Sequence, residues 1–230
     1  MKTIISCLFV VIITLTLGEN PVYSASNSDE LKKGLQLMRE EEKLAHDVYL
    51  ALYEKWKIPV FSNIARSESR HFDAVGYLLD TFEIKDPVYD KIGKFRNKEL
   101  AQMYDELIEQ GTSSIPAALK VGAFIEELDI QDLQKQLGYN HNELVSTVFG
   151  NLLRASGNHL RAFTRQLESH GIEYEPVVLE EAAFINIVNS TSRPGRMHLL
   201  KEDGNSLPNC QQNIRMKGKG KNARANCIYN

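Results

Sequence analysis

Five ionisable side chains fall at positions where helical periodicity predicts a buried, apolar stripe. They are Glu42, Glu68, His71, Glu126 and His159. Removing a charged group from water is unfavourable unless it pairs with another charge or binds a metal, so a lone interruption of this kind would be unexpected. Because the interruptions fall near the middle of four separate helical segments, we expect these side chains to meet in space.

The spacing of one pair indicates metal chemistry. Glu68-Ser69-Arg70-His71 places a carboxylate and an imidazole three residues apart, on one face of a helix. With one further glutamate from each partner helix, this Glu-x-x-His pattern forms carboxylate-bridged centres of two iron or two manganese ions in helical bundles. Carboxylate and imidazole donors suit iron, manganese or zinc better than calcium. We therefore expect the five residues to be metal ligands, with two iron ions favoured and manganese or zinc as alternatives.

Helices position these residues, because strand signals are scarce between residues 27 and 189. Apolar residues that recur every three or four positions predict four long helices, at about residues 28–56, 61–82, 114–137 and 142–170. A shorter helix is expected at about residues 98–110, within the long connection between the second and third long helices, and a last short one within residues 176–189. Ser28 is a suitable N-cap for the first helix. The expected fold class is all-α: a four-helix bundle with a long crossover that carries an extra short helix.

The two halves of this region repeat one pattern. Glu42 precedes the Glu68-x-x-His71 pair, and Glu126 precedes a Ser156-x-x-His159 pair at a similar separation. This repetition resembles the duplicated helix pair of the ferritin-like superfamily. Tyr49 follows Glu42 by seven residues. That spacing is similar to the one on the first helix of ferritins, where the tyrosine lies by the metal site.

A closer resemblance, to one family, covers about residues 31–189. Four segments resemble the motifs of an uncharacterised ferritin-like family of archaea and bacteria, known as a domain of unknown function; they are residues 39–49, 67–71, 125–130 and 158–163. The resemblance implies a di-iron or di-manganese carboxylate centre that reacts with dioxygen or peroxide or oxidises Fe(II). Tyr49 would then be the catalytic residue of an oxidoreductase, carrying an electron. Since a fold does not fix a function, the alternative is a non-enzymatic helical binding module with a degenerate metal site.

Ser156 departs from the ferritin pattern, in which a glutamate would stand three residues before His159. Serine is a poor ligand for iron, so one carboxylate of the usual set is missing. Glu127, Asp129 and His46 are the residues that could substitute for it. The sequence therefore leaves open an asymmetric two-metal centre, a single-metal centre and a degenerate site without metal.

Two of the predicted glutamates have acidic neighbours that compete for the same role. Glu42 ends the run Glu40-Glu41-Glu42, and a run of charges is usually a solvated helix face. Only Glu42 of this run falls on the apolar stripe. Glu126 is followed by Glu127, and helical phase favours Glu126. We therefore expect Glu42 and Glu126 to be the two that point inward.

The chain begins with a predicted secretory signal peptide, residues 1–25. Lys2 precedes an apolar run from Ile4 to Leu17, and small residues around Ser24 offer a cleavage site. The run is shorter than the ~20 residues that a membrane-spanning helix needs, so we expect no stable membrane span after cleavage. An uncleaved N-terminal anchor is the alternative. With either outcome we expect the rest of the chain outside the cytoplasm, as a secreted or periplasmic protein.

Composition and charge restrict the partners. The chain has 230 residues, of which 43% are hydrophobic, and a net charge of −3, values that fit a globular protein and exclude a globally basic nucleic-acid binder. The expected partners are metal ions with dioxygen or peroxide. A homo-oligomer is compatible with the sequence, which leaves the oligomeric state open.

The charge is unevenly distributed between the predicted bundle domain, residues 27–189, and the C-terminal tail, residues 190–230. The tail has eight basic and two acidic side chains, so the bundle domain is strongly acidic. We expect a disordered, solvated tail, with contact to an anionic surface as the alternative. The tail also contains Cys210 and Cys227, which predict a disulfide in an oxidising compartment.

Overall fold

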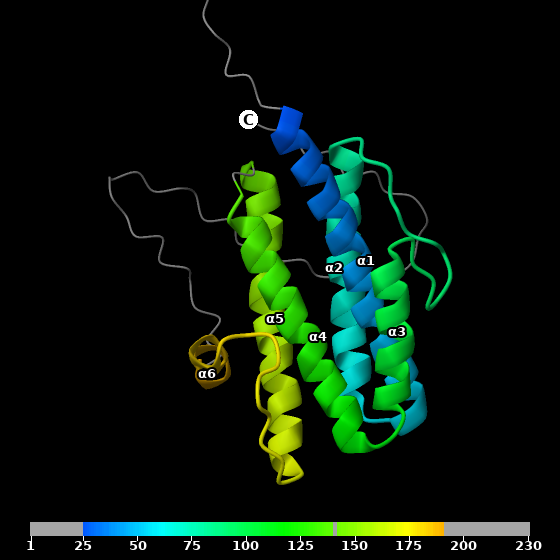
Figure 1. Cartoon of the computed structure of the whole chain (residues 1–230), viewed down its shortest axis with the longest axis vertical. Helices are drawn as coiled ribbons and strands as arrows, with labels where there is room; N and C mark the ends of the chain where they lie inside the picture. The colour runs from blue at the N-terminus through cyan, green and yellow to red at the C-terminus, as the bar shows by residue number, and fades with distance from the viewer. Residues whose placement is uncertain (1–24, 140–141, 191–230) are drawn as a thin grey trace, which may run out of the picture. The chain divides into compact units, whose positions relative to one another are not determined.

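The computed structural model describes residues 25–139 and 142–190. These residues form helices and no strand, which confirms the predicted all-α class (Figure 1). The six helices are α1 (Ala25–Trp56), α2 (Pro59–Thr81), α3 (Lys98–Gly111), α4 (Ile115–Leu137), α5 (Glu143–Ser169) and α6 (Glu181–Asn189). None of the helices in the described ranges is long and apolar enough to span a membrane. The predicted leader, the basic tail and the Cys210–Cys227 pair lie outside the described residues, apart from Ala25 and Ser190 at their inner edges.

Local sequence explains where most helices begin and end. The side chains of Asn97, Ser114 and Asn142 accept hydrogen bonds from backbone N–H groups in the first turns of α3, α4 and α5. Gly171 follows α5 with a φ of +71°, a left-handed conformation that favours glycine. One predicted boundary is wrong: α1 begins at Ala25, so the proposed N-cap Ser28 lies inside the helix.

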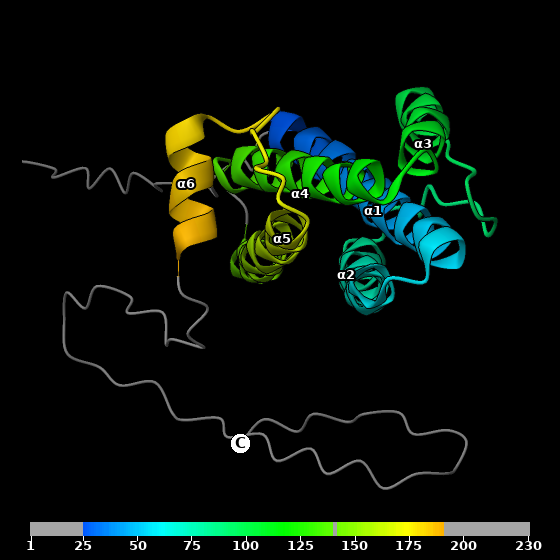
Figure 2. The ribbon, with the colours of Figure 1, turned by 90° about the horizontal axis from the view of Figure 1, so that it is seen from below.

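The four long helices form a bundle of two antiparallel pairs. The first pair is α1 with α2 and the second is α4 with α5 (Figure 2). A crossover of residues 82–114 joins the pairs and contains α3, which packs against α1 and α4. The last helix, α6, packs against α5. All five predicted metal ligands lie on the four bundle helices.

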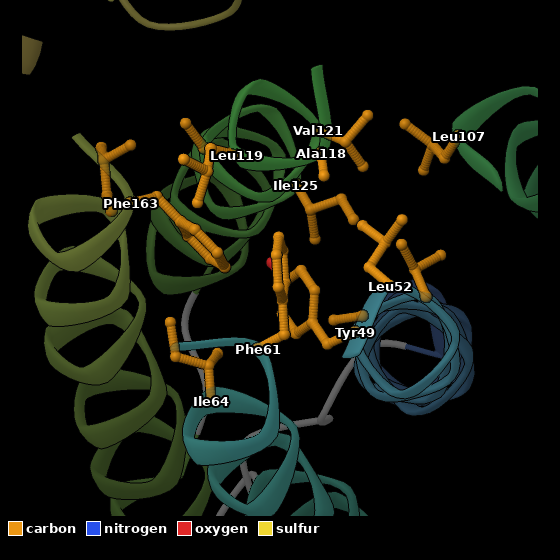
Figure 3. Packing of buried hydrophobic residues seen from close by; sticks show 14 of the residues in the cluster. Tyr49, Leu52, Phe61, Ile64, Leu107, Ala118, Leu119, Val121, Ile125 and Phe163 are labelled. Atoms are coloured by element: carbon orange, nitrogen blue, oxygen red, sulfur yellow. The ribbon is translucent and has the colours of Figure 1, made fainter. Parts of the chain in front are cut away.

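Two apolar clusters fill the bundle, one on each side of a polar layer. The Tyr49 cluster contains the rings of Tyr49, Phe61 and Phe163, which converge from α1, α2 and α5 with centroids 5.3–6.3 Å apart (Figure 3). The Met38 cluster contains Met38, Val75, Phe149 and Leu152, among others. Between them, the polar layer consists of Glu42, Glu68, His71, Glu126, Asp129, Ser156 and His159. A bundle core that is otherwise apolar is therefore interrupted at one level.

Acidic residues of α1 hold the crossover in place. Glu40 accepts hydrogen bonds from the backbone N–H groups of Arg96 and Asn97, and it is only 4% exposed. Asp47 accepts one from the backbone N–H of Gly93 at 2.9 Å and pairs with Lys43. The expectation that the run of residues 40–42 has a solvated face is therefore wrong for Glu40, because the crossover covers it.

Replacing Asp47 by asparagine should lower the free energy of unfolding by about 3 kcal/mol at neutral pH, because removing one partner of a buried ion pair costs roughly 3–5 kcal/mol. Burial alone would raise the pKa of Asp47, but hydrogen bonds from His46, Lys43 and Gly93 hold it below the ordinary value. A lowered folded-state pKa stabilises the protein above the unfolded-state pKa of about 4. That stabilisation is lost as the pH falls through the folded-state value.

Urea unfolding of the wild type and Asp47→Asn measures this effect. The two curves should differ most at neutral pH and converge toward about pH 2. A difference below about 1 kcal/mol at neutral pH, the size expected of an exposed pair, would contradict the assigned role.

Candidate metal centre

The bundle brings the five predicted ligands together in the polar layer. Glu42 comes from α1, Glu68 and His71 from α2, Glu126 from α4 and His159 from α5. The three glutamates are fully buried, and each histidine side chain is 11% exposed. They form two groups, the first triad of Glu42, Glu68 and His71 and the second triad of Glu68, Glu126 and His159. Within each triad, one ligand atom from every residue lies within 4.8 Å of the others.

Glu68 belongs to both triads and lies between the two histidines. Its Oε2 is 2.6 Å from Nδ1 of His71, and its Oε1 is 2.8 Å from Nδ1 of His159. Each Nδ1 is also 3.4 Å from an Oε2 atom, that of Glu42 for His71 and that of Glu126 for His159. The imidazole rings stack with centroids 5.6 Å apart. The two triads thus have matching geometry, and the carboxylate of Glu68 is shared between them.

Most of the oxygen and nitrogen atoms that could bind a metal in this centre have no hydrogen-bond partner among the described residues. This holds for both carboxylate oxygens of Glu42 and Glu68, for Oε2 of Glu126 and for Nδ1 of both histidines. The short nitrogen–oxygen distances within the triads become ion pairs when the imidazoles are protonated. Because buried polar atoms are normally satisfied, each orphaned atom requires an explanation. Unpartnered carboxylate oxygens and imidazole nitrogens that converge in a buried layer fit a divalent transition-metal ion.

The buried carboxylates of the polar layer also favour the binding of positive charge. Burial alone would lower the pKa of both imidazoles, but Glu42 and Glu68 raise that of His71 to about 9. Glu126 and Glu68 likewise raise the pKa of His159 to about 10. Burial raises the pKa of Glu42 to about 8 even though His71 opposes this. In the metal-free protein, protons therefore supply the positive charge that balances the carboxylates.

Tyr49 lies beside the second triad. Its hydroxyl donates to Oε1 of Glu126 at 2.7 Å and also lies 3.2 Å from the carbonyl oxygen of Gly122. Burial and the charge of Glu126 raise the pKa of Tyr49 well above its ordinary value. The phenol is therefore protonated and holds the Glu126 carboxylate in place. This contact joins the polar layer to the Tyr49 cluster.

Glu127 has a separate role from its neighbour Glu126. It is fully buried, but its carboxylate accepts a hydrogen bond from the Tyr174 hydroxyl at 2.6 Å. It also accepts three from the successive backbone N–H groups of residues 177–179, at 2.7–3.1 Å. Glu127 thus anchors the segment before α6, and it is Glu126 that belongs to the triad, as helical phase predicts. Sequence reasoning missed the anchor because nothing near Glu127 in the chain marks its partners.

Replacing Glu127 by alanine should lower the free energy of unfolding by about 2–4 kcal/mol, because hydrogen bonds to a charged acceptor contribute roughly 1.5–3 kcal/mol each and water replaces some of them. Metal content should stay at the wild-type level, since Glu127 lies outside both triads. Glu126→Gln is the matched control. It should lose bound metal, because Glu126 belongs to a triad, and its free energy of unfolding without metal should change less than that of Glu127→Ala. Urea unfolding and metal analysis of both variants check this. Loss of metal from a folded Glu127→Ala chain would contradict the assignment.

The three residues that could replace the missing carboxylate differ in their surroundings. Ser156 itself is fully buried and donates to the carbonyl oxygen of Leu152 in its own helix. Glu127 is engaged as the anchor. His46 is half-buried with Nδ1 3.1 Å from Oδ1 of Asp47, and it belongs to neither triad. Asp129 is also outside the triads, but it is buried in the polar layer and one of its oxygens has no partner.

Comparison with known proteins places most of the chain in a defined group. Residues 31–191 match the model of an uncharacterized protein domain, DUF2202. The protein named Uncharacterized protein MJ0754, from Methanocaldococcus jannaschii, is 48% identical over 169 residues, which is 73% of this chain and 91% of the relative. The crystal structure of hypothetical protein MJ0754 from Methanococcus jannaschii is similar with a TM-score of 0.70 at 48% identity. That match covers 71% of this chain and 94% of the solved one.

Proposed function

This chain belongs to the DUF2202 domain family, and we propose that it is a ferritin-like metal protein whose polar layer binds two metal ions. The observation that supports this most is the pair of buried triads, which share Glu68 and have unpartnered donor atoms. Each triad offers two carboxylates and one imidazole. This donor set suits iron or manganese, with zinc as a further candidate.

We propose that the centre reacts with dioxygen or peroxide. With iron bound, it would supply two electrons: two Fe(II) become two Fe(III) while dioxygen takes up two protons to give hydrogen peroxide, or hydrogen peroxide takes up two protons to give two waters. The apolar clusters lie on both sides of the layer, in which the three glutamates are fully buried and the two histidine side chains are 11% exposed. The remaining steps involve protons and electrons that the chain's own residues must handle.

Tyr49 is suited to carry an electron to this centre. A phenol that loses an electron must also lose its proton, and Oε1 of Glu126 lies 2.7 Å from the Tyr49 hydroxyl to accept it. A further Fe(II) from solution would return the electron, becoming Fe(III), as the proton returns from Glu126 to the phenol. The rings of Phe61 and Phe163 surround the phenol and separate it from water. Tyr49→Phe should therefore leave metal binding intact and slow the oxidation.

Anaerobic loading followed by oxidation tests the proposed function. Metal-free full-length protein is titrated with Fe(II), and dioxygen or hydrogen peroxide is then added while Fe(III) absorbance is followed. We expect about two ions per chain, one for each triad, and oxidation faster than that of the same amount of Fe(II) in buffer without protein. Less than about 0.2 ion per chain with Fe(II), Mn(II) and Zn(II) alike would overturn the proposal.

Ser156 favours one second candidate, a helical binding module whose metal site is degenerate. Serine stands where the repeat in the first half of the chain has Glu68, so the two halves are not equivalent. This candidate predicts that the chain folds fully and binds no metal stoichiometrically. The same titration therefore separates the two functions.

We also propose that the protein is exported, which rests on the leader of residues 1–25. N-terminal sequencing of the mature protein from its source tests this. A start near residue 25 or 26 is expected, and a mature protein in the cytoplasm that starts at Met1 would contradict it.

A further inference from the structure

The polar layer contains one more carboxylate than the two triads use. Asp129 lies on α4 three residues after Glu126, hence on the same helix face and nearly one turn further along. It is only 3% exposed, and its Oδ2 has no hydrogen-bond partner among the described residues. No cationic side chain of the described ranges forms an ion pair with it. A buried carboxylate in this state is unfavourable unless a cation binds nearby.

Asp129 and Ser156 lie on the same side of the layer. Asp129 follows Glu126 toward the C-terminal end of α4, whereas Ser156 precedes His159 toward the N-terminal end of α5. These two ends adjoin, because a short connection joins the antiparallel helices. Leu133, about one turn beyond Asp129, and Leu152, about one turn before Ser156, both belong to the Met38 cluster. The carboxylate present on α4 therefore stands at the level where α5 lacks one.

The charge of the layer supports a role for this carboxylate. Three glutamates with neutral imidazoles carry a charge of −3, so two divalent ions would leave the buried centre with one excess positive charge. Asp129 brings the total to zero. Because an unbalanced charge inside a protein is costly, neutrality favours the loaded state. Glu127 cannot serve instead, since four hydrogen bonds already engage its carboxylate.

We infer that Asp129 is the fourth carboxylate of the metal centre and takes the role that Ser156 leaves open on α5. This inference rests on the proposed function. Asp129 lies outside the close triads, so it is a charge-balancing and positioning residue of the pair of ions. The two halves of the centre differ in sequence at Ser156, but with Asp129 the centre still has four carboxylates.

Metal titration of three variants tests this inference. Asp129→Asn removes the charge and keeps the shape, Asp105→Asn removes an equal charge from an exposed position on α3, and Asp129→Asn with Ser156→Glu moves the carboxylate to α5. Co(II) binding is measured anaerobically from the visible spectrum and from total metal. We expect Asp129→Asn to lower the affinity for at least one of the two Co(II) ions by about 10–100-fold, which is the usual effect of losing a group that supports a metal ligand. Asp105→Asn should match the wild type, and the double variant should recover to within about threefold of it.

The outcomes separate this inference from the proposed function. If the wild type binds two ions and Asp129→Asn binds them equally well, the inference fails and the proposed function stands. If the wild type binds no metal, both fail. A loss that Ser156→Glu does not correct, in a double variant whose circular dichroism and unfolding midpoint match the wild type, also overturns the assignment. Ser156→Asp takes the place of Ser156→Glu if the longer side chain prevents folding.

Discussion

A chain that carries Glu68→Gln should bind neither metal ion, although its helices form normally. Glu68 supplies one oxygen to each triad, at 2.6 Å from His71 and 2.8 Å from His159. An amide has no charge and only one acceptor oxygen, so it cannot bridge two cations. Loss of an outer supporting group already reduces metal affinity about 10–100-fold, so loss of a bridging ligand should cost more than about 100-fold for both ions.

Glu42→Gln and Glu126→Gln are the matched controls, because each belongs to one triad only. Each variant should bind one metal ion more weakly and bind the other with an affinity near that of the wild type. Isothermal titration with Mn(II) or Co(II) counts the sites in the four proteins. One ion retained at wild-type affinity by Glu68→Gln would show that Glu68 does not bridge the two sites.

Metal binding should raise the unfolding temperature of the full chain by a large amount. A ligand that binds only the folded state stabilises it by about 4 kcal/mol when its free concentration is 1,000 times its Kd. For a chain of this size, each kcal/mol raises Tm by roughly 2–4 °C, so one filled site predicts an increase of about 8–16 °C and two sites predict more.

Scanning calorimetry with and without Mn(II) measures this increase, and an excess of chelator should reverse it. Ca²⁺ is the matched control ion, since it prefers six to eight oxygen ligands and the triads contain imidazoles. It should shift Tm by less than about 2 °C. An equal shift with both ions would indicate non-specific binding to the acidic surface rather than a site in the polar layer.

The helices and the inward-facing residues could be predicted from the sequence because both follow from local periodicity. Helix phase alone places Glu42 and Glu126 toward the core, and the helix starts predicted at about residues 114 and 142 lie within one residue of the first residues of α4 and α5. The fold is specified by information within each segment and by the lengths of the connections. The same logic brings the polar positions of four helices to one level.

Contacts between distant segments could not be predicted in this way. Glu40 is buried because residues 96 and 97, which are 56 and 57 positions away, donate to it. Glu127 is engaged by Tyr174 and the residues that follow it, 47 to 52 positions away. A glutamate in a charged run looks the same in sequence whether it faces water, anchors a loop or binds a metal. Only the burial and the partners of each carboxylate separate these roles, and they single out Asp129 from the three substitutes that the sequence left open.

Anomalous X-ray diffraction from crystals of the full chain grown with Mn(II) or Fe(II) tests the two-metal centre most directly. We expect two peaks about 3.5–4 Å apart, the usual separation in two-metal sites, one within each triad and with the Glu68 carboxylate between them. A single peak, peaks only on the protein surface, or no peak from protein that is saturated with metal would contradict the two-metal centre.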